Sequence, residues 1–405
     1  MLAGDLGFYV LAIIGHAAFW IALVNRLHGT GAPCWFVKTV TLSAYSFTVF
    51  GPLAFLVWAV PDRLDILGRL LGGELPWLLV CYLVLCVVIA AVLIPCWLWQ
   101  RLLARPTPIL RRQQTTAYDL GRELGRQASG THLGHWITAL PLNETLRLEV
   151  TEKTLEIAGL PQRLDGLAIA HLSDLHFTGR VSKSFFQEVI RLANELDADL
   201  VAVTGDLVEK TACVDWIPDT FGRLQARRGA YFVLGNHDAR VDIVRLRRAL
   251  VAAGLVDLGG RWQTLEVDGQ SVFLAGNELP WFSPAPAVRN SAALAAAGLK
   301  IVLAHTPDQL DWARRHGFDL MLAGHTHGGQ IVLPIIGPVA SPSLYGVKYA
   351  AGTFYEPPTV LHVSRGVSGE LPFRWNCTPE ISRLILTTAK SDGRPSARLA
   401  ASAHS

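Results

Sequence analysis

Five apolar runs between residues 167 and 323 each end in side chains that can bind metal ions. One run, 230–234, leads into Gly235-Asn236-His237-Asp238, and the other four lead into carboxylates or imidazoles. The polar residues after the five runs are, in order, Asp174 and His176; Asp206; Asn236, His237 and Asp238; His305; and His325 and His327. Gly235-Asn-His-Asp238 alone could equally be a plain turn, because Gly, Asn and Asp favour turns, and a lone histidine at a strand end is more often structural. Their recurrence in series favours one shared site.

The runs have the length and composition of buried strands, and helical stretches separate them. Functional groups in sheet-based α/β folds gather at the carboxyl ends of strands, so five such ends can converge. In Asp174-Leu-His176 and in His325-Thr-His327 the single intervening residue lets both outer side chains face one way on an extended backbone. Nearby glycines permit the tight turns and close approach that such a site needs. These are Gly205, Gly235, Gly324, Gly328 and Gly329.

Seven of these side chains form a set of metal ligands. They are two carboxylates, one amide and four imidazoles: Asp174, Asp206, Asn236, His176, His305, His325 and His327. Mixed oxygen and nitrogen donors suit Mn²⁺, Fe, Zn²⁺ or Co²⁺ better than Mg²⁺ alone or a thiolate-bound ion. Seven ligands exceed one tetrahedral site but serve two ions that share a carboxylate. Two metals about 3.5–4 Å apart are the known arrangement for phosphoester hydrolysis.

The N-terminal part of the chain has the composition of a membrane region. The chain of 405 residues is 51% hydrophobic and 17% charged, and the apolar excess lies in residues 1–100. Three stretches, 6–24, 39–60 and 77–99, are long and apolar enough to span a bilayer. Tryptophans cluster near their ends, as expected at the headgroup level. A signal peptide is a weaker reading of the first stretch, because it lacks a basic start and two spans follow.

Charge predicts the orientation of these spans. Six arginines follow the third span: Arg101, Arg105, Arg111, Arg112, Arg122 and Arg126. By the positive-inside rule they place the large C-terminal part in the cytoplasm, and three spans then place the N-terminus outside. We therefore expect a multi-pass protein of the cell membrane, in contact with membrane lipids. A net charge of +3 gives no support for nucleic-acid binding, and the six cysteines form no CxxC pair.

The expected organisation is a transmembrane region over 1–100, a basic juxtamembrane linker over 101–144, and an α/β domain over 145–388. The small polar residues 389–405 are predicted to be a disordered tail. Within the domain, 146–157 alternates as one or two strands, whereas 184–196, 216–227, 241–253 and 287–298 have helical patterns.

The ordered motifs resemble the calcineurin-like metallophosphoesterase superfamily. The resemblance covers residues 165–388 and rests on Asp174-Leu-His176, Gly205-Asp206, Gly235-Asn-His-Asp238, His305 and Gly324-His-Thr-His327. The continuation to Gly328-Gly-Gln330 and the segment 374–381 are similar to the membrane-associated bacterial branch of YkuE and YaeI-type phosphodiesterases.

This resemblance implies a four-layer α/β/β/α sandwich of two mixed sheets with a dimetal site along one edge. It implies that Asp174, His176 and His327 bind the first ion, that Asp206 bridges, and that Asn236, His305 and His325 bind the second. It further implies that His237 contacts the phosphoryl oxygen and assists the leaving group, while Asp238 fixes the orientation of the His237 ring.

We therefore expect a membrane-anchored phosphohydrolase for phosphodiester or pyrophosphate bonds, with lipid-linked phosphoesters among its candidate substrates. Apolar rims at Trp281-Phe282 and at 333–346 could receive acyl chains, although plain packing is the commoner role of such loops. Two alternatives stay open. One is an idle metal- or nucleotide-binding sensor or scaffold, which the intact His237-Asp238 pair disfavours. The other is a tethered phosphodiesterase for soluble substrates.

Overall fold

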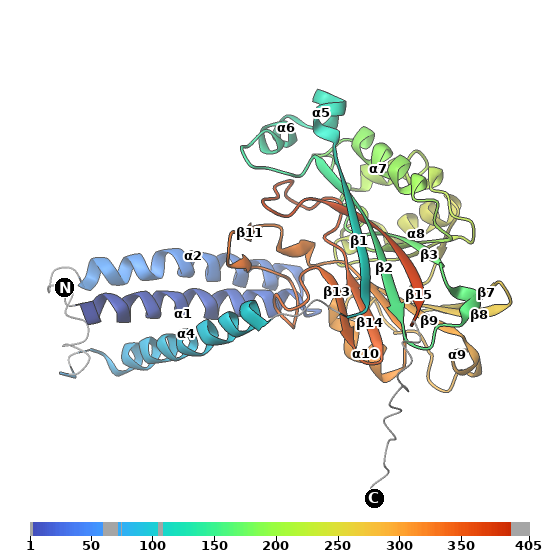
Figure 1. Ribbon diagram of the computed structural model, residues 1–405. Helices are drawn as coiled ribbons and strands as arrows, with labels where there is room; N and C mark the ends of the chain where they lie inside the picture. The colour runs from blue at the N-terminus through green and yellow to red at the C-terminus, as the bar shows by residue number, and fades with distance from the viewer. Residues whose placement is uncertain (1–2, 60–71, 74, 104–107, 390–405) are drawn as a thin grey trace, which may run out of the picture.

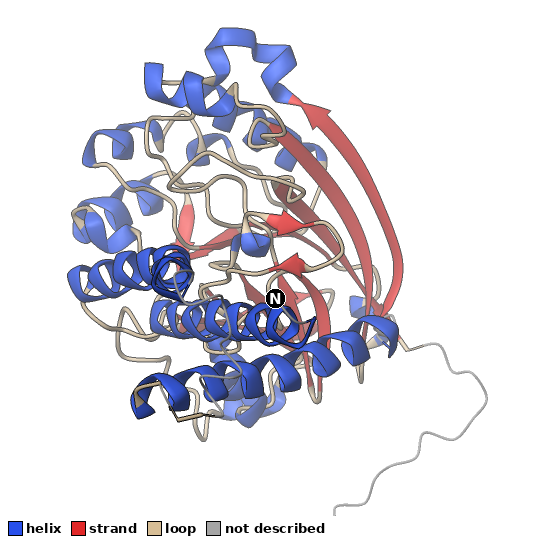
Figure 2. Cartoon of the chain, turned by 90° about the vertical axis from the view of Figure 1, so that its left-hand side faces the viewer, coloured by secondary structure: helices blue, strands red, loops and turns tan. Residues whose placement is uncertain are grey.

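The computed structural model describes residues 3–59, 72–73, 75–103 and 108–389. A bundle of three long helices, α1 (Ala3–His28), α2 (Cys34–Ala59) and α4 (Trp77–Leu103), abuts a larger domain built on two β-sheets (Figure 1). Viewed from the side of the bundle, these helices lie in front of the strands (Figure 2). Three predicted features lie outside the described residues: the end of the second span at Val60, the arginine at position 105, and the tail beyond residue 389.

Two of the three long helices have the length and composition of membrane spans. They are Gly7–His28 within α1 and Trp77–Trp99 within α4. Over the described part of the chain α2 is not among the helices that meet this test. It nevertheless joins the bundle, where the Tyr9 hydroxyl donates to the carbonyl of Pro52 at 2.9 Å. A third span over 39–60 therefore stays a prediction from sequence.

The first sheet has the strand order β1-β2-β15-β3-β4-β5-β6. These strands are β1 (Leu110–Asp119), β2 (Arg147–Ile157), β15 (Glu380–Thr388), β3 (Ala168–Leu172), β4 (Leu200–Thr204), β5 (Ala230–Val233) and β6 (Leu255–Asp257). Strands β3 to β6 are parallel, so their carboxyl ends lie at one edge. β15 is antiparallel to β3 and β1 is antiparallel to β2, which makes the sheet mixed.

The second sheet has the order β13-β14-β10-β9-β8-β7. Its strands are β13 (Gly352–Glu356), β14 (Thr359–Val363), β10 (Leu320–Ala323), β9 (Leu299–Ala304), β8 (Gln270–Asn277) and β7 (Trp262–Val267). The four central strands are parallel, and the two edge strands are antiparallel to their neighbours. A separate pair, β11 (Val332–Leu333) and β12 (Gly337–Pro338), forms a small hairpin.

The two sheets pack face to face, and helices cover their outer faces. Leu200 and Ala202 of β4 belong to the apolar core between the sheets, whereas Val201 and Val203 pack toward the helices. Burial on both faces explains why such strands read as continuous apolar runs. The helices of the domain are α5 (Leu120–Leu124), α6 (His132–Thr138), α7 (Lys183–Glu195), α8 (Ile243–Ala252), α9 (Ala292–Ala296) and α10 (Leu310–Arg315). The mixed α/β sheets agree with the predicted fold class.

The region predicted as a linker, 101–144, is largely part of the domain. Leu110–Asp119 forms edge strand β1, which pairs along its length with β2. Most side chains of β1 are exposed on both faces, so the sequence carries no apolar alternation that would mark a strand. The first sheet therefore begins at Leu110, 35 residues before the predicted boundary at residue 145.

Two predicted helices are also shorter or different in the structure. The stretch 216–227 contains only short 3₁₀ turns, Thr211–Trp216 and Phe221–Arg223, in place of an α-helix. Helix α9 covers only Ala292–Ala296 of the predicted 287–298. In both cases the local sequence suggested more helix than the packing supports, since propensity is a weak prior against tertiary context.

A buried ion-pair network ties β2, β15 and the segment after β14 together. Glu380 accepts from Lys153 Nζ at 2.8 Å and from Arg365 Nε at 2.6 Å, and the side chains of Glu380 and Lys153 are about 6% and 5% exposed. The cost of desolvating both charges offsets much of what such an ion pair contributes to the free energy of unfolding. Removal of one partner is nevertheless strongly destabilising, because it leaves the other charge buried without a partner.

We expect Glu380→Ala to destabilise the protein by about 3–5 kcal/mol, which corresponds to a fall in Tm of about 10 °C. The matched control is Glu152→Ala, which breaks the 2.8 Å pair with Arg383 on the same two strands, where both side chains are partly exposed. Because exposed pairs contribute about 1 kcal/mol or less, the control should change Tm little. Thermal unfolding of the purified full chain measures both, and equal shifts would contradict the assignment.

Candidate metal centre

The predicted ligands come together where the two sheets meet. Strands β3, β4 and β5 are neighbours in the first sheet, and β9 and β10 are neighbours in the second. The seven donor side chains all follow the carboxyl ends of these five strands. Five separate segments of sequence therefore reach one buried position, as the sequence analysis expected from parallel strands.

The predicted ligands form two groups that share Asp206, and His176 also belongs to a third group with Glu209 and His237. In the first group, His327 Nε2 lies 3.5 Å from Asp174 Oδ1 and 3.2 Å from His176 Nε2. His176 Nε2 is also 3.6 Å from Asp206 Oδ2. Each distance joins two groups that can donate lone pairs to one cation, so the four side chains can surround a single ion.

The second group lies on the other side of the same carboxylate. His305 Nε2 is 3.2 Å from Asp206 Oδ2, 3.2 Å from Asn236 Oδ1 and 3.2 Å from His325 Nδ1. Because Asp206 Oδ2 faces both groups, one carboxylate can serve two neighbouring ions. This is the geometry that two-metal sites require.

Hydrogen bonds at the far side of three imidazoles fix which nitrogen faces the cluster. His305 Nδ1 lies 2.7 Å from the carbonyl of Thr204, and His327 Nδ1 lies 3.2 Å from that of Ser368. His176 Nδ1 contacts the carboxylate of Glu209. A carbonyl or carboxylate accepts, so Nδ1 of His305 and of His176 carries a proton, and Nε2 of each ring faces the cluster. The contact with Ser368 likewise leaves Nε2 of His327 facing the cluster. Such partners are the usual second layer around metal-binding histidines.

The residues fit the binding of metal ions. Asp206 is fully buried and His325 is 4% exposed, yet within the described chain neither Asp206 Oδ2 nor His325 Nε2 has a hydrogen-bond partner. Buried polar atoms without partners are costly, and a cation between these donors would remove that cost. The mixed oxygen and nitrogen donors suit divalent ions of the Mn, Fe, Zn or Co type.

The backbone at the site is held in unusual conformations. Five of the seven donor residues have positive φ: Asp174, His176, Asp206, His325 and His327. Asp and His tolerate this region better than most residues, but it still carries strain that usually marks functional sites. Gly235 permits a close approach, because a Cβ there would lie 2.3 Å from Asp206 Oδ1. The turn after β5 can touch the shared carboxylate only because residue 235 has no side chain.

The carboxylate beside His237 belongs to Glu209 and not to Asp238, so the predicted role of Asp238 was wrong. His237 Nδ1 lies 3.0 Å from Glu209 Oε1. Asp238 is fully buried, and its two oxygens accept from the backbone N–H groups of Leu207, Val208 and Gly235 at 2.8–2.9 Å. Asp238 thus braces the turns after β4 and β5. Adjacent residues on a turn point in different directions, which adjacency in sequence does not reveal.

Two further residues beside the site were missed by sequence reasoning. Glu209 lies three positions after Asp206 and contacts both His176 and His237. In the sequence, only its place in the run Gly-Asp-Leu-Val-Glu could have indicated that it belongs to the site. Arg374 is 1% exposed, and its NH2 lies 3.2 Å from His327 Nδ1. Trp281, predicted as an apolar rim, packs its ring 4.8 Å from that of His325, which makes it a wall of the second ligand group.

The charges of the cluster are strongly coupled. Burial alone would raise the pKa of Asp206, but His305, His237 and His176 bring it well below its usual value. Burial would lower the pKa of His305, but the carboxylate of Asp206 raises it to about 9. Without a metal the site therefore holds a carboxylate and an imidazolium together at neutral pH.

We expect Mn²⁺ binding at pH 7 to release at least one proton per chain. His305, with a pKa of about 9, is cationic at that pH, and its Nε2 must lose the proton before it can bind an ion. The number released should fall, and the affinity should rise, as the pH increases toward 9. Calorimetric titration in buffers of different ionisation enthalpy measures the release, and heats independent of the buffer at pH 7 would contradict it.

Comparisons with known proteins agree with this geometry. The profile of the Calcineurin-like phosphoesterase family matches residues 167–329. The uncharacterized metallophosphoesterase YkuE of Bacillus subtilis (strain 168) is 29% identical over 59% of this chain and 85% of its own. The phosphodiesterase YaeI of Escherichia coli (strain K12) is 30% identical, over 54% of this chain and 81% of its own.

A third relative aligns along nearly the whole chain. It is a transmembrane protein with metallophosphoesterase domain from Danio rerio, which is 25% identical over 94% of this chain and 88% of its own. The match with YaeI is long enough, at sufficient identity, to establish the family. Ordered donors on five strand ends and these similarities lead to one conclusion: the chain belongs to the calcineurin-like metallophosphoesterases, metal-dependent hydrolases of phosphoester bonds, in the branch of YkuE, YaeI and the transmembrane metallophosphoesterase proteins.

Proposed function

We propose that the chain is a membrane-anchored phosphohydrolase that holds two divalent ions and cleaves phosphodiester or pyrophosphate bonds, including those of lipid-linked substrates. The observation that carries the proposal is the pair of donor groups that share Asp206. Asp174, His176 and His327 would hold one ion, Asn236, His305 and His325 the other, and Asp206 both.

The chain's own residues orient the reaction. Two ions bound there would activate the attacking water and neutralise charge on the phosphoryl oxygens. His237 is 15% exposed at the edge of the cluster, and its Nε2 lies 4.0 Å from Asp206 Oδ2. An imidazole at this edge supports a role as the proton donor to the departing alcohol, and the carboxylate of Glu209 lies 3.0 Å from its other nitrogen. Arg240, 2.9 Å from Glu209, fixes that carboxylate in turn.

The membrane part of the proposal rests on the helical bundle. α1 and α4 are long and apolar enough to span a bilayer, and α2 would be the third span. Arg101, Arg111 and Arg112 follow the apolar span Trp77–Trp99 of α4 and would place the domain in the cytoplasm, with the N-terminus outside. A relative that carries both a transmembrane part and the catalytic domain aligns over most of the chain, which supports this arrangement.

Substitution of His237 tests the hydrolase directly. We expect His237→Ala to retain two metal ions per chain while turnover of bis-p-nitrophenyl phosphate with Mn²⁺ falls by about a hundredfold or more, because the side chain serves as an acid and not as a ligand. His135→Ala, a variant of an exposed histidine on α6, is the control and should leave turnover unchanged.

The full chain is the proper sample, since the first sheet of the domain already begins with β1 at Leu110. If the parent protein binds metal but hydrolyses neither soluble nor lipid phosphoesters, the idle sensor or scaffold is favoured. Equal turnover of soluble substrates with and without a bilayer would favour the tethered enzyme for soluble phosphodiesters.

Substitutions of Glu209 and Asp238 should affect different quantities, the first kcat and the second stability. Glu209→Gln removes the charge beside His237 and keeps the shape, so we expect kcat to fall about tenfold with Tm unchanged. Asp238→Asn turns an amide N–H toward the backbone N–H of Gly235 and should cost about 1–3 kcal/mol of stability. Steady-state kinetics and thermal unfolding separate the two. A loss of kcat confined to Asp238→Asn would restore the role predicted from sequence.

A further inference from the structure

Residues of the helical bundle line the cavity over the metal-ligand cluster. The cavity, about 220 Å³, is bounded on one side by His176, Asn236, His237 and other residues of the domain. Its opposite side is formed by Val24, Asn25 and His28 of α1 and by Tyr45 of α2. The site is therefore not complete within the domain alone.

The junction between bundle and domain is fitted closely. The Asn25 side chain donates to the carbonyl of Val339 at 3.2 Å and accepts from the N–H of Ser341 at 2.9 Å. A Cβ at Gly29 would lie 2.7 Å from the backbone nitrogen of Leu344, so only glycine permits this approach. On α4, Trp97 Nε1 donates to the carbonyl of Ile336 at 3.1 Å. Specific contacts from two helices thus hold α1 against the loop 336–344.

Three of the four helix residues that line the cavity, Asn25, His28 and Tyr45, carry polar groups, unlike those expected of a plain anchor. His28 Nε2 lies 2.9 Å from Thr41 Oγ1, which ties the end of α1 to the start of α2. Val24 precedes His28 by four residues on α1, and Tyr45 follows Thr41 by four residues on α2. Each therefore lies one helical turn, about 6 Å, further into the bundle than the contact between His28 and Thr41. The cavity consequently reaches from the metal-ligand cluster about one turn into the bundle. Polar side chains in such spans are costly and are usually functional.

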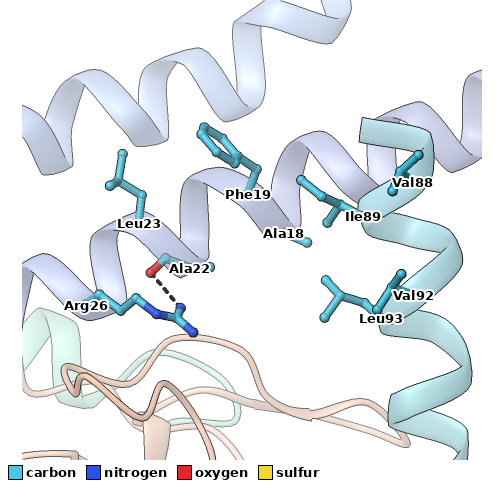
Figure 3. A pocket seen from close by; sticks show the side chains of 9 residues that line it. All are labelled: Ala18, Phe19, Ala22, Leu23, Arg26, Val88, Ile89, Val92 and Leu93. Carbon is cyan, nitrogen blue, oxygen red and sulfur yellow. Dashed lines mark hydrogen bonds between the residues drawn. The ribbon is translucent and has the colours of Figure 1, made fainter. Parts of the chain in front are cut away.

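A second hollow in the bundle has a different character. It lies between α1 and α4, and its lining is apolar apart from Arg26, which donates to the carbonyl of Ala22 at 3.1 Å (Figure 3). None of its lining residues contributes to the metal cavity. Arg26 lies within one helical turn of His28 but outside the metal cavity, which makes it a matched control position.

We propose that α1 and α2 complete the substrate site, with His28 and Tyr45 contacting a phosphoester whose alkyl chain stays among the membrane helices. The inference rests on the proposed function and specifies its substrate class as lipid phosphoesters. An imidazole and a phenol can donate hydrogen bonds to phosphoryl oxygens or to the leaving alcohol. Extraction of a lipid costs about 0.8 kcal/mol per CH₂, and a site at the end of the bundle avoids that cost.

Two chromogenic diesters test the proposal on the full chain in lipid nanodiscs: p-nitrophenyl hexadecyl phosphate and p-nitrophenyl methyl phosphate. We expect the parent protein to prefer the hexadecyl ester in kcat/KM. His28→Ala and Tyr45→Phe should each lower kcat/KM for that ester about tenfold, the loss of one hydrogen bond to a charged group, with two metals retained. Arg26→Ala should leave it within twofold.

The possible results distinguish a failure of the proposed hydrolase function from a failure of the role given to the helices. No hydrolysis of either ester by the metal-loaded parent would overturn the proposed function. Hydrolysis of both esters with equal kcat/KM, or His28→Ala and Tyr45→Phe variants that behave like Arg26→Ala, would overturn only the role of the helices.

A spectroscopic measurement tests the placement without turnover. In a variant with all six cysteines replaced by alanine, a nitroxide attached at His28→Cys should be broadened by Mn²⁺ bound in the site. A nitroxide at Val10→Cys, near the other end of α1, should not be broadened. An unbroadened signal at position 28 would contradict the proposal.

Discussion

The site depends on one carboxylate that is shared between two groups of ligands. Asp206 follows β4, the middle one of the three adjacent parallel strands β3, β4 and β5. Its Oδ2 faces His176 on one side and His305 on the other, at 3.6 and 3.2 Å. Because these imidazoles belong to different sheets, the position of Asp206 is set by the packing of the whole sandwich. Movement of one sheet against the other would separate the two groups.

This arrangement is costly in the protein without metal. Buried carboxylates and imidazoles lie together, and five of the donor residues have backbone conformations with positive φ. The core between the sheets and the brace at Asp238 offset these costs. Metal binding would remove much of the remaining penalty, so folding and metal affinity are linked at this edge. The same turns carry Glu209 and His237, which couples the catalytic groups to the ligands.

The sequence predicted those parts of the structure that have a local signature. Apolar runs ending in Asp, Asn and His located the ligands, since parallel strands bring their carboxyl ends together. Glu209 and the true role of Asp238 escaped, because side-chain direction on a turn has no periodic signal. Strand β1 escaped because an exposed edge strand shows no apolar alternation. His28 and Tyr45 lie 146 and 129 residues before the first metal ligand, Asp174, and only the packing of the bundle on the domain places them beside it.

The most direct measurement of the central claim is electron paramagnetic resonance of the full chain titrated with Mn²⁺. Two ions that share the Asp206 carboxylate lie close enough for their spins to couple. We predict binding of two Mn²⁺ per chain with a spin-coupled spectrum, and loss of the coupling in Asp206→Asn. A spectrum of isolated Mn²⁺ at full occupancy, or no binding at all, would contradict a shared carboxylate and with it the dimetal site.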